Sequence, residues 1–532
     1  MAEKVQVRFS PEDGTVEVDK GTDLLDAAIE ADIYIDSICG GRGKCGKCKV
    51  IVQAGDVSAE ETELLTPDDV KKGYTLACQT TADSDVDVLV PEESRVGLHQ
   101  ILMKAEVVEA GELDPPVMKF HFELSEPTLT DNLSDLDRLK RALSGRGVGD
   151  IMGHLPVMRK MSGLFRESKW DVTATIVEDG DCHELVHLEG GDTSARNFGL
   201  AVDVGTTTVV LELVNLSTGE IVAKKASYNK QVMHGEDVLT RILHAEEEKD
   251  GLGDLRRLIV ETINLLLEEM MERAKVHRNE ICYAAMAGNT VMTHLLLGLN
   301  PAHIRREPYI PTANFFPLIK ARETGININP EGYVYILPCR SSYVGGDITA
   351  DVLASALHKT DKLSMLIDVG TNGEVVLGNK DWMVSCSCSA GPAFEGGEVD
   401  CGMRATAGAI EKVALMTDME VKYSTIGDMK PKGICGSGLI DLLAEMFTHG
   451  VIDRSGRIKP LKIPRVRDGS EGKEFVVVWA DETKVEKDIV ISEVDIRNII
   501  RTKAAVYAAA TVLLKTMKYT FDDVEQIFIA GG

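Results

Sequence analysis

Hydrophobic positions along the chain change spacing several times, and each change marks a new segment. Within residues 1–95, apolar side chains at alternate positions, as in Val5–Phe9, predict strands. A turn at Pro11–Gly14 leads into a second strand. A short helix is expected over Thr22–Ala31, where Thr22 or Asp23 supplies the cap. Residues 1–95 therefore predict one small domain built mainly from strands.

The pattern is weaker between residues 96 and 196. Residues 96–125 predict a linker that carries one or two strands and is broken by Pro115–Pro116. Residues 126–196 predict a small middle domain with a charged helix near Asp131–Leu143. We find no residues in this stretch that point to a reaction.

From residue 197 to 532 the chain predicts an α/β domain that contains an internal repeat. The segment LAVDVGTTTVVLEL (200–213) recurs as MLIDVGTNGEVVLG (365–378). Each copy has a buried apolar strand, an Asp-Val-Gly-Thr turn and a second strand. Two such copies indicate a duplicated domain with two lobes.

Composition and charge exclude several classes of function. The net charge is −27, and nothing in the sequence suggests the clustered Lys and Arg that a nucleic-acid surface needs. We find no run of about 18 uncharged apolar residues that would predict a membrane span. The first residues lack the apolar core of a signal peptide, so a cytoplasmic protein is expected.

Four of the eleven cysteines are grouped near the N-terminus. Cys39, Cys45 and Cys48 lie on one glycine-rich loop, and Cys78 comes from later in the same domain. Glycines let the backbone wrap closely around a cluster, and the loop N–H groups favour its anionic sulfurs. The spacing has one residue more in its first gap than the plant-type pattern C-x4-C-x2-C…C. It resembles ferredoxins of the adrenodoxin type, within a β-grasp fold that binds a 2Fe–2S cluster.

A zinc site is the main alternative for these four cysteines, and unligated thiols are the other. Zinc sites usually combine two C-x2-C pairs, and this sequence has only one. The remaining seven cysteines predict small core residues. They are Cys182, Cys282, Cys339, Cys386, Cys388, Cys401 and Cys435.

The two repeated turns have the composition of phosphate-binding loops. Gly205 and Gly370 let backbone amides approach a phosphate, and neighbouring side chains can donate hydrogen bonds to it. Asp203 and Asp368 can hold Mg²⁺ through its water ligands. The donors expected around them are Thr206, Thr207, Thr208, Thr371, Asn372 and Gly373. The chain has no G-x4-G-K-[ST] motif, so it is not a P-loop NTPase.

These residues together resemble the superfamily of acetate and sugar kinases, heat-shock chaperone ATPases and actin. The resemblance implies that Asp347, at the start of a helix, is the water-orienting or general-base carboxylate, although an ordinary helix cap is the alternative. The strand and paired glycines of Ile527–Gly532 look like the start of the adenosine motif, which gives Gly531 and Gly532 a role in ATP binding. Family members continue beyond this motif, so we expect the sequence to be truncated.

A narrower resemblance, to the reductive activators of corrinoid proteins, covers nearly the whole chain. These proteins join a 2Fe–2S domain, a linker, a middle domain and this ATPase fold. Segments that resemble them are Ser389–Gly396, Gly433–Asp441 and Asp495–Ala508. Within the second of these segments, Gly436, Ser437 and Gly438 are expected to contact the nucleotide.

The resemblance implies ATP-dependent reduction of a corrinoid protein from Co(II) to Co(I), with the 2Fe–2S cluster as electron carrier and Mg²⁺ beside ATP. It also implies an upstream low-potential donor and a homodimer. Two alternatives remain: a small-molecule kinase with a redox-sensing ferredoxin domain, and a plain ferredoxin electron carrier.

One further motif is weighed and set aside. The segment His183–His187 matches the H-E-x-x-H signature of zinc proteases, which needs a helix to bring both histidines to one face. Here glycine-rich turns flank it closely, so a strand between turns is expected instead.

Overall fold

The structure is a computed structural model of the 532-residue chain. It describes residues 3–11, 14–31, 33, 35, 43, 46–60, 62, 64–65, 67–91, 94, 113–180, 182–235, 237–370, 372–470 and 472–531. The predicted ligands Cys39 and Cys45 and the predicted nucleotide contacts Thr371 and Gly532 lie outside these residues.

The N-terminal domain is a mixed sheet packed against the longer of its two helices. The strands pair in the order β2-β1-β7-β3-β5, and the antiparallel hairpin of β1 and β2 confirms the predicted turn. Asp23 caps the helix, because its carboxylate accepts hydrogen bonds from the N–H groups of Leu25 and Asp26. The elements are β1 (Lys4–Ser10), β2 (Gly14–Asp19), α1 (Leu24–Glu30), β3 (Lys49–Ala54), β4 (Val57–Ala59), α2 (Pro67–Lys71), β5 (Tyr74–Leu76), β6 (Thr80–Ala82) and β7 (Val86–Leu89).

The next unit is a four-stranded sheet, ordered β8-β10-β11-β9, with two helices packed on it. Its elements are β8 (Val117–Glu123), α3 (Asp135–Ser144), β9 (Ile151–Gly153), α4 (Leu155–Glu167), β10 (Asp171–Asp179) and β11 (Cys182–Gly190). Strand β8 pairs with β10, so the unit begins before residue 126, where we expected the middle domain to start. His183–His187 lies within strand β11, which confirms that it is not the helical zinc motif.

The repeat forms two sheets, one in each lobe. The first is ordered β14-β13-β12-β15-β17-β16 and the second β20-β19-β18-β27. Each begins with the same three antiparallel strands, which confirms the predicted duplication. The strands are β12 (Phe198–Val204), β13 (Thr208–Asn215), β14 (Ile221–Tyr228), β15 (Ile281–Ala287), β16 (Ile319–Lys320), β17 (Tyr333–Ile336), β18 (Ser364–Val369), β19 (Gly373–Gly378), β20 (Met383–Cys388) and β27 (Gln526–Ala530).

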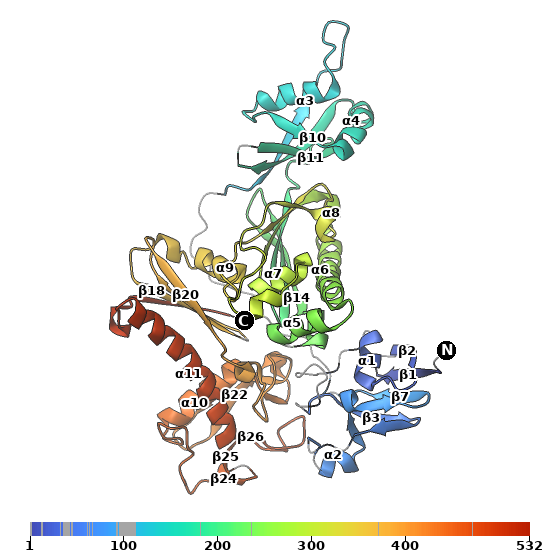
Figure 1. Ribbon diagram of the computed structural model, residues 1–532. Helices are drawn as coiled ribbons and strands as arrows, with labels where there is room; N and C mark the ends of the chain where they lie inside the picture. Colours follow the sequence, from blue (N-terminus) through green and yellow to red (C-terminus); the bar gives the residue numbers. More distant parts are fainter. Residues whose placement is uncertain are drawn as a thin grey trace.

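Helices cover the two sheets and one helix joins them. The first sheet packs its apolar side against α5 (Val238–Glu247), α6 (Gly251–Ala274) and α7 (Thr290–Leu297). The second packs against α11 (Glu493–Thr516). Helix α9 (Gly346–Ala354) contacts β15 of the first lobe and β18 of the second, and Figure 1 shows it between the two.

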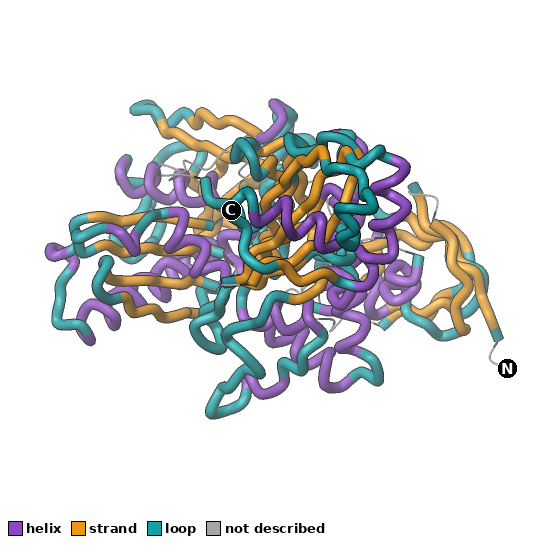
Figure 2. The backbone as a smooth tube through the Cα atoms, turned by 90° about the horizontal axis from the view of Figure 1, so that it is seen from above, coloured by secondary structure: helices purple, strands orange, loops and turns teal. Residues whose placement is uncertain are grey.

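The second lobe carries an additional layer of small sheets around its own apolar core. These sheets are ordered β22-β21-β23 and β24-β25-β26. The remaining elements are α8 (Ala321–Thr324), β21 (Ala409–Leu415), β22 (Val421–Thr425), β23 (Gly433–Ile434), α10 (Gly436–Thr448), β24 (Val466–Gly469), β25 (Gly472–Val478) and β26 (Ile489–Ser492). Figures 1 and 2 both show the N-terminal end at the periphery and the C-terminal end near the middle of the molecule.

The seven other cysteines divide by burial. Cys282, Cys339 and Cys435 are buried, and Cys386, Cys388 and Cys401 are half-buried. Cys182 is exposed, so its prediction as a core residue is wrong; it stands at the first position of β11, next to a turn. None of these seven forms a disulfide.

Candidate functional site

Two of the four predicted cluster ligands lie among the described residues, and the fold brings them together. The Sγ atoms of Cys48 and Cys78 are 3.3 Å apart, although 30 positions separate the residues in sequence. Cys48 leads into β3, and Cys78 lies in the short 3₁₀ turn Ala77–Gln79 after β5. These two strands pair, and the Ala77 N–H donates to the Cys48 carbonyl oxygen at 2.8 Å.

The backbone beside these cysteines fits a bound cluster. Gly43 and Gly46 have φ angles of +65° and +67°, in the left-handed region that favours glycine. A Cβ on Gly46 would also meet the Leu64 side chain at 3.2 Å. The backbone therefore requires glycine at these two positions. A loop that wraps closely around a cluster has the same requirement.

The first phosphate loop connects β12 to β13 without room for a side chain at its turn. A Cβ on Gly205 would stand 2.4 Å from the carbonyl oxygen of Thr208. The Asn289 side chain donates a hydrogen bond of 2.9 Å to Thr206 Oγ1. Since that oxygen accepts from Asn289, the Thr206 hydroxyl proton can be donated to another acceptor such as a phosphate oxygen.

The second phosphate loop connects β18 to β19 at the equivalent place in the other lobe. It is closed by its own backbone, because the Gly370 N–H donates to the Asn372 carbonyl oxygen at 2.9 Å. The end of β27 lies directly against it: a Cβ on Gly531 would be 2.2 Å from the Val369 carbonyl oxygen. Gly531 has φ of +105°, so the first of the paired glycines is required by conformation as well as by space.

Carboxylates from both sheets and from α9 gather between the two loops. Asp347 and Asp368 both perturb Asp203 electrostatically, and Asp368 also perturbs Asp347, so the structure brings the three predicted acids together. It adds two acids that the sequence analysis did not single out, Asp351 and Glu374. Asp351 lies one helical turn after Asp347 on α9, and Glu374 pairs with Asp368 across β18 and β19.

Burial raises the pKa values of these acids, and repulsion between neighbouring carboxylates adds to it for most of them. Burial, followed by repulsion from Asp368 and Asp347, raises the pKa of Asp351 to about 8. Burial also raises the pKa of Glu374 to about 8, against the lowering effect of its 2.8 Å hydrogen bond from Ser387 Oγ. Because these carboxylates disfavour one another's ionisation, a cation bound among them would stabilise their charged forms.

The pKa values of the three predicted acids are raised as well. Protein atoms surround Asp203 and, with Asp347 and Asp368, raise its pKa to about 7, although solvent still reaches its side chain. Burial raises the pKa of Asp347 to about 6 in spite of a hydrogen bond of 2.8 Å from the Ile348 N–H to its carboxylate. Burial also raises the pKa of Asp368.

These carboxylates fit Mg²⁺ held through water. Within the described residues, no three His, Cys, Asp or Glu side chains converge closely enough to hold a metal ion directly. Mg²⁺ usually keeps several waters and relies on one or two carboxylates plus substrate phosphates. Asp203 and Asp368 each stand next to the last residue of their strand, β12 and β18, and their role as Mg²⁺-holding residues stays a prediction.

Helix α9 fixes Asp347 relative to the first lobe. The N–H groups of Gly346 and Asp347 donate to the Gly288 carbonyl oxygen at 2.9 and 3.4 Å. A Cβ on Gly345 would be 2.4 Å from the Asn289 Cα atom, so the helix begins in contact with the residue that binds Thr206. The predicted catalytic role of Asp347 stays a prediction.

The predicted contacts Gly436, Ser437 and Gly438 open helix α10. A Cβ on Gly436 would meet the Phe394 carbonyl oxygen at 2.2 Å, and one on Gly438 would meet the Ile410 carbonyl oxygen at 2.3 Å. Both glycines are therefore needed for close packing in the second lobe. Contact between this helix end and a nucleotide stays a prediction.

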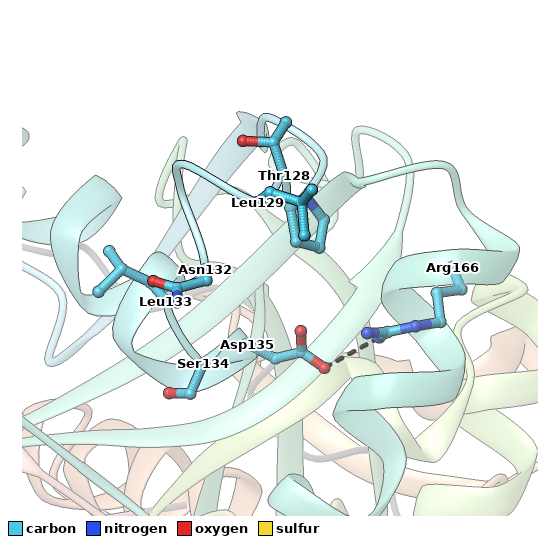
Figure 3. Close-up of a pocket in the computed structure, with 8 residues that line it drawn as sticks. Thr128, Leu129, Asn132, Leu133, Ser134, Asp135 and Arg166 are labelled. Atoms are coloured by element: carbon cyan, nitrogen blue, oxygen red, sulfur yellow. Dashed lines mark hydrogen bonds and ion pairs between the residues drawn. The ribbon is translucent and has the colours of Figure 1, made fainter.

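A hollow elsewhere on the described surface has a different character. It measures about 710 Å³ and is lined by Arg166 and by residues 127–129 and 132–135, in the unit built on β8–β11. Figure 3 shows the ion pair of Arg166 with Asp135, whose closest atoms are 2.9 Å apart. The other polar groups around it are neutral side chains, so we do not assign this hollow a chemical role.

Comparison with known protein families now adds to this geometry. Residues 7–83 match the 2Fe-2S iron-sulfur cluster binding domain. Residues 106–195 match the RACo linker region, residues 198–360 the RACo middle region, and residues 362–532 the C-terminal domain of RACo, described as the ASKHA domain. The four matches follow one another along nearly the whole chain.

A solved structure decides the family. The structure entitled "Reductive activator for corrinoid,iron-sulfur protein" is 42% identical, covers 99% of this chain and 86% of its own, and superposes with a TM-score of 0.74. The chain belongs to this family of reductive activators. Membership confirms the predicted architecture of an N-terminal 2Fe–2S domain, intervening domains and an ASKHA ATPase domain. The cofactors of that architecture are the 2Fe–2S cluster, ATP and Mg²⁺.

Two curated relatives are also similar. The corrinoid activation enzyme RamQ of Eubacterium limosum is 29% identical over 99% of this chain and 86% of its own. The [Co(II) methylated amine-specific corrinoid protein] reductase of Methanosarcina barkeri is 23% identical over 63% of each chain. In both names the partner is a corrinoid system. None of the described helices is long and apolar enough to span a membrane.

Proposed function

We propose that this protein is an enzyme that uses ATP to drive the one-electron reduction of a corrinoid protein from Co(II) to Co(I). The observation that carries the proposal is the presence, in one chain, of a cysteine site and of two facing phosphate loops with carboxylates between them. A 42% identical reductive activator aligned over 99% of the chain supports the same activity.

The cysteines provide the electron-transfer end. Cys39, Cys45, Cys48 and Cys78 would hold a 2Fe–2S cluster, which supplies one electron at about −400 mV in plant-type proteins. The partner's cobalt gains that electron, and an upstream low-potential donor then returns one electron to this protein. The net change is one Co(II) converted to Co(I) for each electron delivered by that donor.

The phosphate loops provide the energy-coupling end. One loop belongs to each lobe, so ATP and Mg²⁺ held by Asp203 and Asp368 would favour a particular arrangement of the lobes. A ligand shifts an equilibrium only by its differential affinity for the two states. ATP must therefore favour a conformation that also changes the bound corrinoid protein or its release.

Three finer features belong to the proposal. The homodimer and the upstream donor rest on the resemblance to the reductive activators. The cytoplasm is proposed as the location, which agrees with seven cysteines that form no disulfide. Sedimentation of the purified protein tests the dimer.

Anaerobic incubation with a Co(II) corrinoid protein and one strong reductant tests the activity. The Co(I) spectrum should appear with the intact protein and ATP, and much less without ATP. A small-molecule kinase would leave cobalt unchanged and phosphorylate an acid or sugar. A plain electron carrier would give equal Co(I) with and without ATP.

The cluster assignment has its own test, by replacement of Cys48 with serine. Cys48→Ser should abolish the 2Fe–2S absorbance, because a thiolate ligand is lost, and cobalt reduction should fall to background. The exposed Cys182 offers a matched control, and Cys182→Ser should leave both unchanged. Metal analysis should give about two iron and two sulfide per chain, and zinc in their place would reject the cluster.

A further inference from the structure

Backbone carbonyl groups of the first phosphate loop accept hydrogen bonds from one segment of the chain. This segment, here called the strap, follows β14 and comprises Asn229, the 3₁₀ turn Lys230–His234 and the first turns of α5 as far as Arg241. Helix α5 packs against this 3₁₀ turn and against α6. Neither Asn229 nor Arg241 belongs to a phosphate motif or to the group of carboxylates described above.

Three consecutive carbonyl groups of the loop accept hydrogen bonds from the strap. The Asn229 side-chain amide donates to the Gly205 oxygen at 2.9 Å, and the Asn229 N–H donates to the Thr207 oxygen at 2.9 Å. Between these two, the Arg241 guanidinium donates to the Thr206 oxygen. Two residues of the strap therefore fix every peptide plane from Gly205 to Thr208.

The direction of these carbonyls determines where the loop N–H groups point. In a trans peptide the C=O and N–H of one plane point in opposite directions. With the carbonyls of Gly205, Thr206 and Thr207 directed at the strap, the N–H groups of the same three planes are directed away from it. An acceptor such as a phosphate on that side of the loop would meet these N–H groups.

The strap is itself tightly constrained. The side chains of Asn229, Gln231 and Arg241 are fully buried. Gln231 Oε1 accepts from Arg241 at 3.1 Å, while its amide donates to the Leu255 carbonyl oxygen of α6 at 2.7 Å. Arg241 Nε donates to the Gly235 carbonyl oxygen at 2.8 Å. Buried polar groups connected in this way specify one geometry, because any displaced donor would lose its partner.

The charge of Arg241 has a second effect. Its guanidinium donates to the Thr206 carbonyl oxygen of the loop, and the whole side chain is buried away from solvent. A positive charge acts more strongly at such a place than at the surface, since the effective dielectric constant is lower. An anionic triphosphate on the opposite side of the loop would be stabilised by it.

We propose that Asn229 and Arg241 are positioning residues for the nucleotide, which act by holding the first phosphate loop so that its N–H groups face the triphosphate. The proposal rests on the ATPase activity proposed above and adds residues for which the phosphate motif itself gives no indication. The residues are not catalytic, because they act through the loop rather than on ATP.

The test measures ATP hydrolysis by the full-length protein without any corrinoid partner, so that it does not depend on cobalt chemistry. Arg241→Lys keeps the charge but loses the fork of donors, and Asn229→Ala removes the amide that reaches Gly205. Each lost hydrogen bond should raise the KM for ATP about tenfold, with a smaller fall in kcat. The 2Fe–2S absorbance should not change.

Matched controls come from α6, where Arg257 is exposed and Asn264 is half-buried. Arg257 pairs only at the surface with Asp254 and Glu261, and Asn264 donates to the Gly325 carbonyl oxygen. Arg257→Lys and Asn264→Ala should leave the KM for ATP within twofold of the wild type. The thermal midpoint of each variant, measured with and without Mg-ATP, reports folding separately from nucleotide binding.

The outcomes are separable. Raised KM values in both strap variants and unchanged values in both controls support the proposal. An unchanged KM in both strap variants, with kcat reduced only in proportion to the folded fraction, overturns it and assigns the strap to structure alone. If the wild type itself neither binds nor hydrolyses ATP, the proposed function fails, and the positioning role fails with it. If Arg241→Lys does not fold, Asn229→Ala alone decides.

Discussion

The two phosphate loops arise from one repeated sequence, yet the protein supports them differently. Three successive carbonyl groups of the first loop accept hydrogen bonds from the strap, which belongs to the same lobe. The second is closed by its own Gly370–Asn372 hydrogen bond and is contacted at Val369 by Gly531 from the end of β27. The repeat thus conserves the position of the loop and of its aspartate, whereas the support comes from unrelated parts of the chain.

This difference indicates that the two lobes have different roles in nucleotide binding. The first loop is fixed within its lobe by buried side chains, and it is suited to holding a triphosphate in one place. The second loop depends on main-chain contacts at the end of an edge strand of its sheet. Helix α9 contacts both sheets, so a change in their separation would move Asp347 and Asp351 relative to either loop.

The largest expected effect is shared by both loops and concerns their aspartates. Asp203→Asn and Asp368→Asn should each lower ATP hydrolysis about a hundredfold, because Mg²⁺ and the developing charge on the phosphates lose an electrostatic partner. The 2Fe–2S spectrum should be unchanged. Steady-state ATPase assays decide this, with the exposed Asp522→Asn as control. Normal activity in both variants would reject the assignment.

Replacement of the loop glycines by alanine should affect the two loops differently. A Cβ on Gly205 would be 2.4 Å from a backbone oxygen, whereas the nearest atom to one on Gly370 is 3.7 Å away. Gly205→Ala should therefore lower the free energy of unfolding by about 1–3 kcal/mol and raise the KM for ATP. Gly370→Ala should change that free energy by less than about 0.5 kcal/mol.

Gly531→Ala is the third member of this comparison. It should behave like Gly205→Ala, because its Cβ would be 2.2 Å from the Val369 carbonyl oxygen and its φ is +105°. Denaturant unfolding measures all three variants. Equal losses in Gly205→Ala and Gly370→Ala would show that the two loops are not packed differently.

A smaller effect follows from the carboxylates beside the second loop. In the nucleotide-free protein, Asp351 and Glu374 have pKa values of about 8, above the unfolded values of about 4. Between these limits the folded state holds more protons than the unfolded state, so stability falls as pH rises. The slope is about −1.4 kcal/mol per pH unit for each retained proton, and Mg²⁺ should reduce it by stabilising the ionised forms.

Thermal unfolding from pH 5 to 8, without nucleotide and with or without excess Mg²⁺, measures this slope. Glu374→Gln should flatten it, since one retained proton is removed. The exposed Glu268→Gln on α6 is the matched control and should not. A nucleotide-free protein that becomes more stable as pH rises through this range would contradict the crowding of the acids.

The sequence predicts the parts of the site that a short motif encodes. The alternating strands, the repeat, the Asp-Val-Gly turns and Asp347 at the start of a helix all follow from local spacing, and the structure brings the three acids together. The family membership supports the cluster and the ATPase domain in the same way.

The residues that the sequence analysis missed act over long separations. Arg241 contacts Thr206 from 35 positions away, and Asn289 contacts it from 83 positions away. An arginine within an amphipathic helix is indistinguishable from a surface residue until the fold is known. Asp351 alone had a usable signal, since it stands four residues after Asp347 on the predicted helix. The exposed Cys182 was misjudged because its residue type was taken as the sign of burial, although Asp181 and His183 flank it and it opens β11.

The central claim is that ATP turnover and cobalt reduction are coupled in one molecule. The most direct measurement is the ATPase rate of the intact protein, under anaerobic conditions, with and without a Co(II) corrinoid protein. We predict that the rate rises when this partner is added and that Co(I) accumulates only while ATP is present. An ATPase rate that ignores the partner, together with equal Co(I) yields with and without ATP, would contradict the account.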